Sequence, residues 1–581
     1  MNRVARRLCR RFCLVRPWMR KFLGIIHPFS SLAIAAVCLL GPAVAAGQMA
    51  TTQDPSAQPG ANTSPQPSPS SAPEASPAEE APSEEAAGQL REKIHKLIEQ
   101  LGAEDYHLRE AAEKELIRLG PAAYEPLLEA LNHPDPEVVA RARYVLRVIP
   151  SQLGWGEESG DIRELLSFYE TGAPEVRRTV LRLLANLGRG RGWPALARLI
   201  RFEREPLWAK RAAIELLAAQ PLLPETRERY AAVLRRHLGE SSRPPLSWIM
   251  VYVQIPTRPD DALPQWRKLV AEEQALLAAQ PERTSAAIVA ALWTLQALAE
   301  SELGQTEAAK ASFARVQELL VPEVPEQLEA MVDLALLLQR RGKVEWAEAE
   351  LRRAVAGADP RRSLRARQAL AELLYDQGHP LAAAQALEPF LKLVQERAVP
   401  MLDLGSVSVG EVRSRMHYFF ACHFLAQGNL AEHRRYLQLA IRDDPRNIDA
   451  LIAAWQLADA PADFREEIRH LILRARSQLE RLLAESTDPE EQASFLNQLA
   501  WLVGNTKGNL DQALNWAKRA VELHPENGAY WDTLAHVYYH RGEWEKAIEA
   551  QTRAVALEPG SAFLARQLEL FQQTLKEKKP R

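Results

Sequence analysis

Cysteine is nearly absent from the 581-residue chain. Cys9, Cys13 and Cys38 all precede residue 46, so Cys422 is the only thiol in the rest of the chain. One thiol cannot form an internal disulfide, which excludes a disulfide-stabilised scaffold. Stability is therefore expected from apolar residues, which make up 47% of the composition. Cys422 lies in an apolar stretch with helical periodicity, which favours a buried, unreactive thiol over a reactive one.

Motifs that carry catalysis or bind cofactors are also absent. The chain has no glycine-rich phosphate loop followed by Lys-Ser or Lys-Thr, no HExxH zinc motif, no nucleophile elbow and no paired-cysteine metal site. The glycine-rich stretch 188–192 follows a predicted helix, and we interpret it as a tight basic turn. His536 and His540 are one helical turn apart, but no third ligand accompanies them. We predict a chain that is not an enzyme and has no cofactor or metal.

Residues 1–46 have the pattern of a signal segment. They carry eight basic and no acidic residues, then an apolar run from Leu32 to Leu40, and then Ala43-Val44-Ala45. The run is shorter than the roughly 20 residues of a transmembrane helix. The pattern predicts an exported, periplasmic or cell-envelope protein, and an uncleaved signal anchor is the alternative. Cleavage would lower the net charge from −3 to about −11, and an acidic chain lacks the basic surface that binds nucleic acid.

Residues 47–88 are rich in proline, serine, alanine and glutamate and contain no aromatic residue. Such a segment cannot bury enough apolar surface to offset the cost of ordering the chain. We predict a disordered linker here.

Residues 89–224 have the apolar periodicity of repeated helices. Ala112, Leu116 and Leu119 recur as small or apolar residues at the same internal spacing, at 142–149 and 180–187. They recur again at 213–220, where the polar Gln220 takes the last position. The segment Asp135–Arg143 and the following VLRVI resemble HEAT repeats. Prolines fall between the helical stretches, where we expect them to end helices. No clean repeat appears at 225–287, which we interpret as connecting helices.

The C-terminal part contains a second repeat pattern. Gly508, Ala513, Ala520 and Pro525 are followed 34 residues later by Gly542, Ala547, Ala554 and Pro559. This pattern resembles the tetratricopeptide repeat, with a well-formed pair at 491–560, degenerate copies at 288–490, and a capping helix with a basic tail at 561–581. The resemblance implies that Ala535 and Ala547 lie where two helices cross and that Gly542 adopts a left-handed turn. The expected fold is all-α, a right-handed superhelical α-solenoid of helical hairpins.

The same resemblance implies a concave groove that binds a partner. In the last two repeats it would be lined by Asn497, Trp501, Asp532, His536, Tyr539 and His540. In earlier repeats Arg365, Gln368, Glu372, Tyr375, Arg415 and Tyr418 occupy equivalent places. Asp532 and His536 stand where a carboxylate-clamping groove needs basic and amide residues, which disfavours a C-terminal peptide as ligand. Ordinary polar surface is the alternative interpretation of these residues.

The function expected from these patterns is an exported, non-enzymatic scaffold that binds a protein or an extended peptide. Two alternatives remain open. One is a membrane-anchored, envelope-organising or structural subunit of a larger complex. The other is an accessory subunit of an enzyme.

Overall fold

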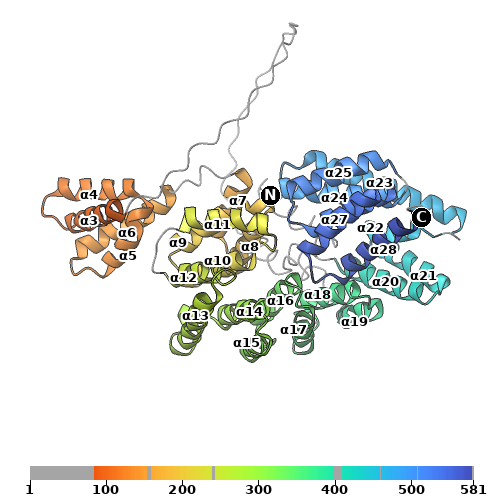
Figure 1. The fold of residues 1–581 in the computed structure, drawn as a ribbon, viewed down its shortest axis with the longest axis horizontal. Helices are drawn as coiled ribbons and strands as arrows, with labels where there is room; N and C mark the ends of the chain where they lie inside the picture. Colours follow the sequence, from red (N-terminus) through yellow and green to blue (C-terminus); the bar gives the residue numbers. More distant parts are fainter. Residues whose placement is uncertain are drawn as a thin grey trace, which may run out of the picture. The chain divides into compact units, whose positions relative to one another are not determined.

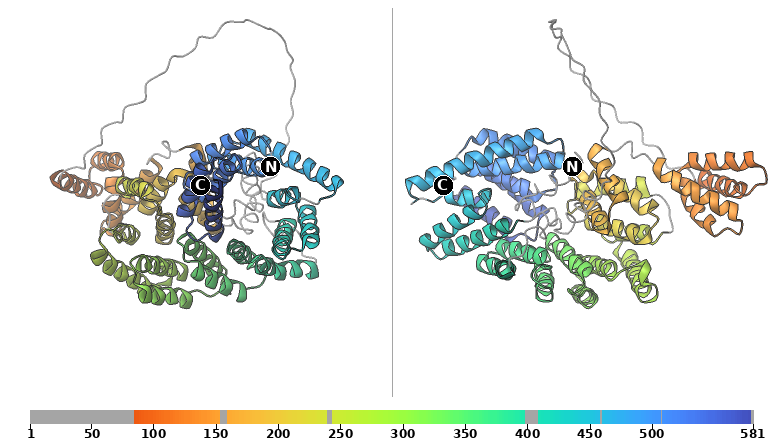
Figure 2. Two further views of the ribbon diagram at one scale, coloured as in Figure 1. Left: turned by 45° about the vertical axis from the view of Figure 1, so that its right-hand side comes forward. Right: turned by 180° about the vertical axis from the view of Figure 1, so that it is seen from behind.

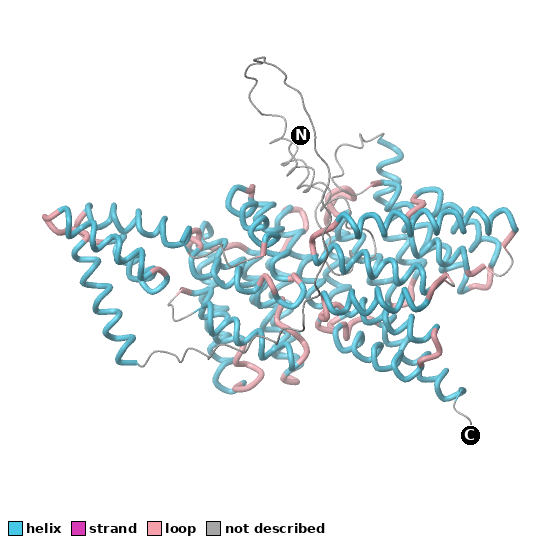
Figure 3. The backbone as a smooth tube through the Cα atoms, turned by 90° about the horizontal axis from the view of Figure 1, so that it is seen from above, coloured by secondary structure: helices cyan, strands magenta, loops and turns pink. Residues whose placement is uncertain are grey.

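The computed structural model describes residues 84–152, 159–238, 243–397, 408–457, 460–506 and 508–578. Every regular element in these ranges is a helix, so the predicted all-α solenoid is confirmed (Figure 1, Figure 3). No helix in these ranges is both long and apolar enough to span a bilayer. The predicted signal segment and residues 47–83 of the predicted linker lie outside the described residues.

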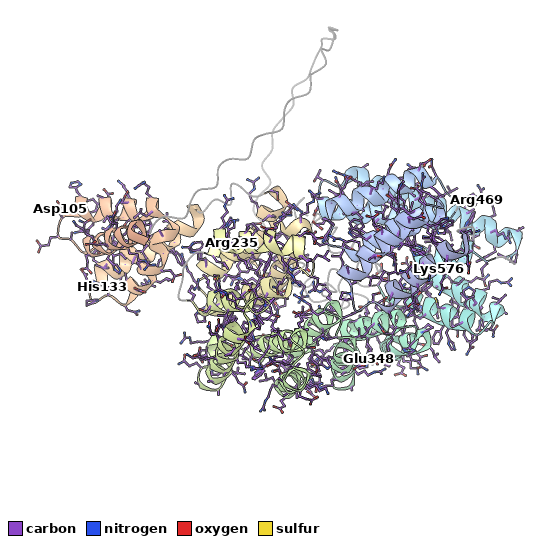
Figure 4. The ribbon with its side chains drawn as sticks, viewed as in Figure 1. Asp105, His133, Arg235, Glu348, Arg469 and Lys576 are labelled. Carbon is purple, nitrogen blue, oxygen red and sulfur yellow. The ribbon has the colours of Figure 1, made fainter. Side chains whose placement is uncertain are left out.

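The first four described helices belong to a separate compact unit, which ends at Glu157. They are α3 (Glu84–Gln100), α4 (Tyr106–Leu119), α5 (Pro121–Glu129) and α6 (Pro136–Gln152). The first of them begins inside the stretch predicted as a linker. Asp105, labelled in Figure 4, caps α4 by accepting a hydrogen bond from the His107 N–H at 2.8 Å.

The division between the two units follows Glu157, inside the segment predicted to be HEAT-like. The apolar side chains of α6 are buried among α3, α4 and α5, whereas Ile162, Leu165 and Tyr169 of the next helix pack on the helix that follows it. The helices from 193 to 302 contact one another without a break, so 225–287 belongs to the second unit. The HEAT-like resemblance of residues 89–224 stays a prediction.

The second unit, here called the main unit, covers the described residues from 159 onward. Its first helices are α7 (Gly160–Thr171), α8 (Pro174–Ala185), η3 (Gly188–Gly190), α9 (Trp193–Phe202), α10 (Pro206–Ala218), α11 (Pro224–Leu238), α12 (Pro244–Tyr252), α13 (Pro259–Ala279) and η4 (Pro281–Arg283). Proline stands in the first turn of most of them, because its missing N–H has no helical partner there. These prolines begin helices, whereas the sequence analysis expected them to end helices.

The remaining helices form hairpins. They are α14 (Ala286–Glu302), α15 (Thr306–Leu319), α16 (Pro325–Arg340), α17 (Val344–Ala356), α18 (Leu364–Asp376), α19 (Pro380–Arg397), α20 (Val409–Ala426), α21 (Leu430–Asp443), α22 (Ile448–Trp455), α23 (Ala462–Glu485), α24 (Pro489–Asn505), α25 (Leu510–Leu523), α26 (Gly528–His540), α27 (Trp544–Leu557) and α28 (Ala562–Lys578). Ala535 and Ala547 are both fully buried, as expected for residues at a helix crossing.

The turn between the helices of a hairpin uses glycine in the left-handed conformation. Gly542 has a φ of 77°, and Gly304, Gly342, Gly378 and Gly428 have φ values between 71° and 88°. Asn505 ends α24 and Leu510 begins α25, so four residues separate these helices, whereas three separate α26 from α27.

His433 shows how a large residue replaces the small one at a helix crossing. Its side chain is buried, and its Nδ1–H donates a hydrogen bond of 2.8 Å to the carbonyl oxygen of Ala421 on the facing helix. The imidazole therefore joins α20 and α21 by a polar contact where other hairpins use the close approach of alanine.

The main unit closes on itself at the turn between α8 and α9. The Gly188 N–H donates to the Glu490 carboxylate at 2.8 Å, and the Arg189 N–H donates to Glu526 at 3.0 Å. His524 Nδ1 lies 3.0 Å from the second oxygen of Glu490. A Cβ on Gly188 would lie 2.9 Å from both His524 and the Leu523 carbonyl, so glycine is required for this approach. Figure 2 shows α8 and α9 beside α24 and α25. We call this contact the closing contact.

The start of α28 is tied to the middle of the array. The buried Asp376 at the end of α18 accepts hydrogen bonds from Ser561 Oγ at 2.6 Å and from the Ala562 N–H at 2.9 Å. A carboxylate at a helix N-terminus is stabilised by the free N–H groups and the helix dipole. Gly560 lies so close to Gln339 that a Cβ would be 2.0 Å from its carbonyl oxygen.

The closing contact predicts a pH-dependent stability. Burial raises the pKa of Glu490, but His524, the Gly188 N–H and Arg191 together lower it by more. The pKa of Glu490 is therefore below the usual 4.5. Burial lowers the pKa of His524, but Glu490 raises it above the usual 6.5. The contribution of Glu490 is present above about pH 4.5 and is lost as the pH falls through its lowered pKa. The contribution of His524 is present below about pH 6.5 and is lost as the pH rises through its raised pKa.

We therefore expect His524→Gln to cost about 1.5–3 kcal/mol near pH 6 and less at alkaline pH. Urea unfolding of both proteins between about pH 5 and pH 9 measures this difference. His470→Gln is the matched control, because His470 is 66% exposed beside Glu466. A cost for His524→Gln that does not change with pH would contradict the prediction.

Candidate functional site

Two of the six residues predicted to line the C-terminal groove are buried. Asn497 on α24 is 1% exposed and Asp532 on α26 is 3% exposed. Asp532 accepts a hydrogen bond of 2.9 Å from Gln551 on the second helix of its own hairpin. In this structure, therefore, these two side chains lie beneath the surface and do not line an open groove.

The other four residues pack between neighbouring helices. The Trp501 ring meets the His536 ring edge to face at 5.0 Å, and His536 meets Phe571 at 5.3 Å. Tyr539 stacks on Phe571 at 4.6 Å, with its hydroxyl 3.2 Å from Thr574. Phe571 and Thr574 belong to α28, so the capping helix covers this end of the concave face. The sequence predicted the cap, but not the face that it covers.

Both histidines of this group are shifted towards the neutral form. Burial lowers the pKa of His536, and nearby Asp532 offsets only part of that effect. Burial also lowers the pKa of His540, whose Nε2 lies 3.3 Å from Asn505. Neutral imidazoles pack well against the aromatic rings of Trp501 and Phe571. At neutral pH, therefore, His536 and His540 are uncharged, and this end of the concave face is lined by aromatic rings.

The residues predicted for earlier repeats pair with one another. Arg415 on α20 donates two hydrogen bonds of 2.7 Å to Glu372 on α18 and one of 2.8 Å to Asp449 on α22. Its guanidinium lies 5.5 Å from the Tyr375 ring centre and 5.2 Å from that of Tyr418. Burial opposes the charge, but the two carboxylates dominate and hold the pKa of Arg415 well above its usual value.

Arg365 repeats this arrangement one hairpin earlier. It is 2% exposed and donates to Glu329 at 2.6 Å and also to Asp333, both on α16. Asp333 in turn accepts a hydrogen bond from Arg182 on α8. The charged side chains of the concave face therefore neutralise one another across helices.

Together these contacts form a continuous series along the first helices of successive hairpins, which we call the inner ladder. Trp501 extends it, because its Nε1–H donates to Asp449 at 3.2 Å. Its members are Glu329, Asp333, Arg365, Glu372, Arg415, Asp449, Trp501, His536 and Phe571. The inner ladder fixes the spacing of the helices from α16 to α28.

An open hollow lies beside the inner ladder within the main unit. It has an empty volume of about 1580 Å³ and is lined by α8, α10, α14, α16, α18, α19, α20 and the turn 558–561. Gln368, Glu372 and Arg415 line it, so three of the twelve residues predicted for the concave face are brought together here. The predicted C-terminal residues do not line it. We call this space the central hollow.

Residues from the N-terminal part of the main unit complete the central hollow. Arg182 comes from α8, and Ile214 and Glu215 come from α10. The repeat pattern did not indicate these three residues, because α8 and α10 lie in the HEAT-like segment, far along the chain from α18 and α20. Leu336 of α16 also lines the hollow. The contact of Arg182 with Asp333 spans 151 positions and has no signature in a repeat pattern.

Glu215 differs from the other carboxylates of the central hollow. The structure gives its side chain no hydrogen bond or ion pair within 4 Å among the described residues. Burial raises the pKa of Glu215, and Arg182 offsets only part of that effect. Arg182 is bonded to Asp333, and Arg340 donates to Asn186 at 3.2 Å.

Metal-ligating side chains do not gather in the described part of the chain. It contains no group of three or more His, Cys, Asp or Glu side chains placed to hold a metal ion. His417 pairs instead with Asp443 at 2.8 Å. The Cys422 Sγ lies 3.8 Å from the Tyr375 hydroxyl, and burial raises the pKa of this thiol.

The inner ladder predicts a large stability cost at Arg415. Arg415→Ala leaves two carboxylates without their partner, and we expect a loss of about 3–5 kcal/mol. Arg435→Ala is the control, because Arg435 is 65% exposed beside Glu432, and we expect it to cost less than about 1 kcal/mol. Urea unfolding measures both free energies. Equal costs for the two substitutions would contradict the role assigned to the inner ladder.

Comparison with known proteins identifies the C-terminal hairpin. Residues 528–561 match the tetratricopeptide repeat family. No curated protein matches the chain. Similar solved structures are yeast Tom70 (12% identity, 85% of this chain, 96% of that chain, TM-score 0.30), the P58(IPK) TPR domain (15%, 57%, 99%, 0.18) and Naa15/Naa10 bound to HypK-THB (16%, 84%, 66%, 0.20).

These TM-scores are low, and the resemblances carry no argument about the function of the chain. The match at 528–561 covers α26 and α27, the hairpin in which Gly542 turns in the left-handed conformation and Ala535 faces Ala547. Residues 528–561 of the chain therefore form a tetratricopeptide repeat.

Proposed function

We propose that the chain is an exported, non-enzymatic scaffold that binds an extended segment of another protein in the central hollow. The observation that carries this proposal is the hollow itself, which opens to solvent between helices that the inner ladder holds in place. A preformed site loses less conformational freedom on binding, which favours affinity.

The lining of the central hollow favours a peptide as ligand. Ile214, Ala218 and Leu336 give it half-buried apolar surface, and Gln368 gives it an amide that can bond to a peptide backbone. Apolar anchors with adaptable polar contacts are typical of protein-recognition sites.

The outer face offers a contrasting surface. Arg235, Arg469 and Lys576, labelled in Figure 4, are exposed charged residues of the main unit. We assign binding to the central hollow and not to this surface because the hollow is concave and has apolar lining.

A photo-crosslinking amino acid at position 336 tests the proposed site. We expect crosslinks from position 336 to a second protein in an envelope fraction, because Leu336 lines the central hollow. The same amino acid at position 469, on the outer face, is the control and should give none. Crosslinks from position 539 but not from 336 would contradict the proposal and place binding at the C-terminal end.

Export rests on the N-terminal segment alone, whose basic and apolar pattern ends in Ala43-Val44-Ala45. We expect the intact mass of the envelope-derived protein to correspond to a chain that begins near residue 46. A full-length mass in the membrane fraction would contradict cleavage and favour the membrane-anchored subunit. A full-length chain in the cytosolic fraction would contradict export.

A further inference from the structure

We propose that the central hollow selects a positively charged peptide, and that Glu215 contacts one of its cationic side chains. This inference rests on the proposed function, because it names the chemistry of the segment that the central hollow binds. It commits to one occupant, an extended segment of a partner protein that combines arginine or lysine with apolar residues.

The side chains that line the central hollow include more carboxylates than cationic groups. Six carboxylates line the central hollow, whereas three guanidiniums and no lysine line it. The carboxylates are Glu215, Asp333, Glu372, Asp376, Glu411 and Glu558, and the guanidiniums are Arg182, Arg340 and Arg415. A concave site with an excess of one charge attracts ligands of the opposite charge, because its walls focus the field.

Most of these carboxylates are already bound within the protein. Asp333 pairs with Arg182 and Arg365, and Glu372 pairs with Arg415. Asp376 caps α28, and Glu411 accepts from Arg446 at 3.1 Å. The arginine partners largely neutralise Asp333, Glu372 and Glu411, and the acceptor positions of these carboxylates are taken by the fold.

Glu215 is placed to accept a new donor. Its neighbours Arg182 and Arg340 are bonded elsewhere, to Asp333 and Asn186, and Glu215 itself has no bond to either. Ile214 precedes it and Ala218 lies one turn further along the same helix, both in the lining. A carboxylate beside apolar surface gains more from a cationic partner than one in water does, because the local dielectric constant is lower.

Apolar side chains of the same peptide would contact the half-buried surface of Ile214, Ala218 and Leu336. A cationic group of the peptide would face Glu215. An acidic segment would meet like charge at the same positions, which disfavours its binding. The lining therefore discriminates between peptides by the sign of their charge.

The test uses the full chain and three fluorescent peptides of equal length. One alternates arginine with leucine, the second has glutamine in place of arginine, and the third has glutamate. We expect the arginine peptide to bind most tightly in fluorescence anisotropy and to weaken with added salt. We expect Glu215→Gln, which preserves the shape of the side chain, to weaken its binding about tenfold.

Glu549→Gln, on the exposed face of α27, is the matched control for a general effect of protein charge and should leave the affinity unchanged. Equal affinities of Glu215→Gln and Glu549→Gln would overturn the role of Glu215. Tight binding of the glutamine or glutamate peptide, lost on Leu336→Glu, would overturn charge selection and keep the hollow as a peptide site. Failure of all three peptides would overturn both proposals. If the protein dimerises and the arginine peptide does not dissociate the dimer, the occupant of the central hollow is a second copy of this chain, which would overturn the proposal.

Discussion

Glu490 makes the contact on which the form of the main unit depends. Its two oxygens meet the Gly188 N–H and His524, and Arg191 adds a third bond at 3.3 Å. These partners come from α25 and from a turn about 300 positions earlier. An array of hairpins has free ends by default, because each repeat contacts only its neighbours. The closing contact adds a long-range constraint that holds the turn between α8 and α9 against α24 and the end of α25.

The contacts of the inner ladder explain why not all residues at groove positions are available to contact a ligand. Arg365, Arg415 and Trp501 stand where an open groove would present side chains to a partner, yet each is bonded to a neighbouring helix. The paired charges at Arg415 are buried, so their benefit comes from geometry and from satisfied hydrogen bonds more than from simple attraction. The same residues therefore fix the curvature of the array and leave recognition to the unbonded positions between them.

Local features of the fold were predictable from the sequence. The turn at Gly542 and the crossing of Ala535 with Ala547 follow from steric rules that act within one hairpin. One residue more separates α24 from α25 than separates α26 from α27, although the first residues of α25 and α27, Leu510 and Trp544, keep the 34-residue period. The burial of His433 at an alanine position required knowledge of its bond to the Ala421 carbonyl.

The candidate site was less predictable, because its parts come from distant segments. Gln368 and Glu372 were placed on the concave face by the repeat pattern, but Glu215 reaches the central hollow from α10, far earlier in the chain. The covering of Tyr539 by Phe571 depends on the direction in which α28 leaves α27, which no local motif specifies. Closure also has an evolutionary consequence. Open arrays gain or lose repeats freely, but one hairpin more or less here would separate Glu490 from Gly188 and Ser561 from Asp376, so the repeat number of this protein is fixed by its own geometry.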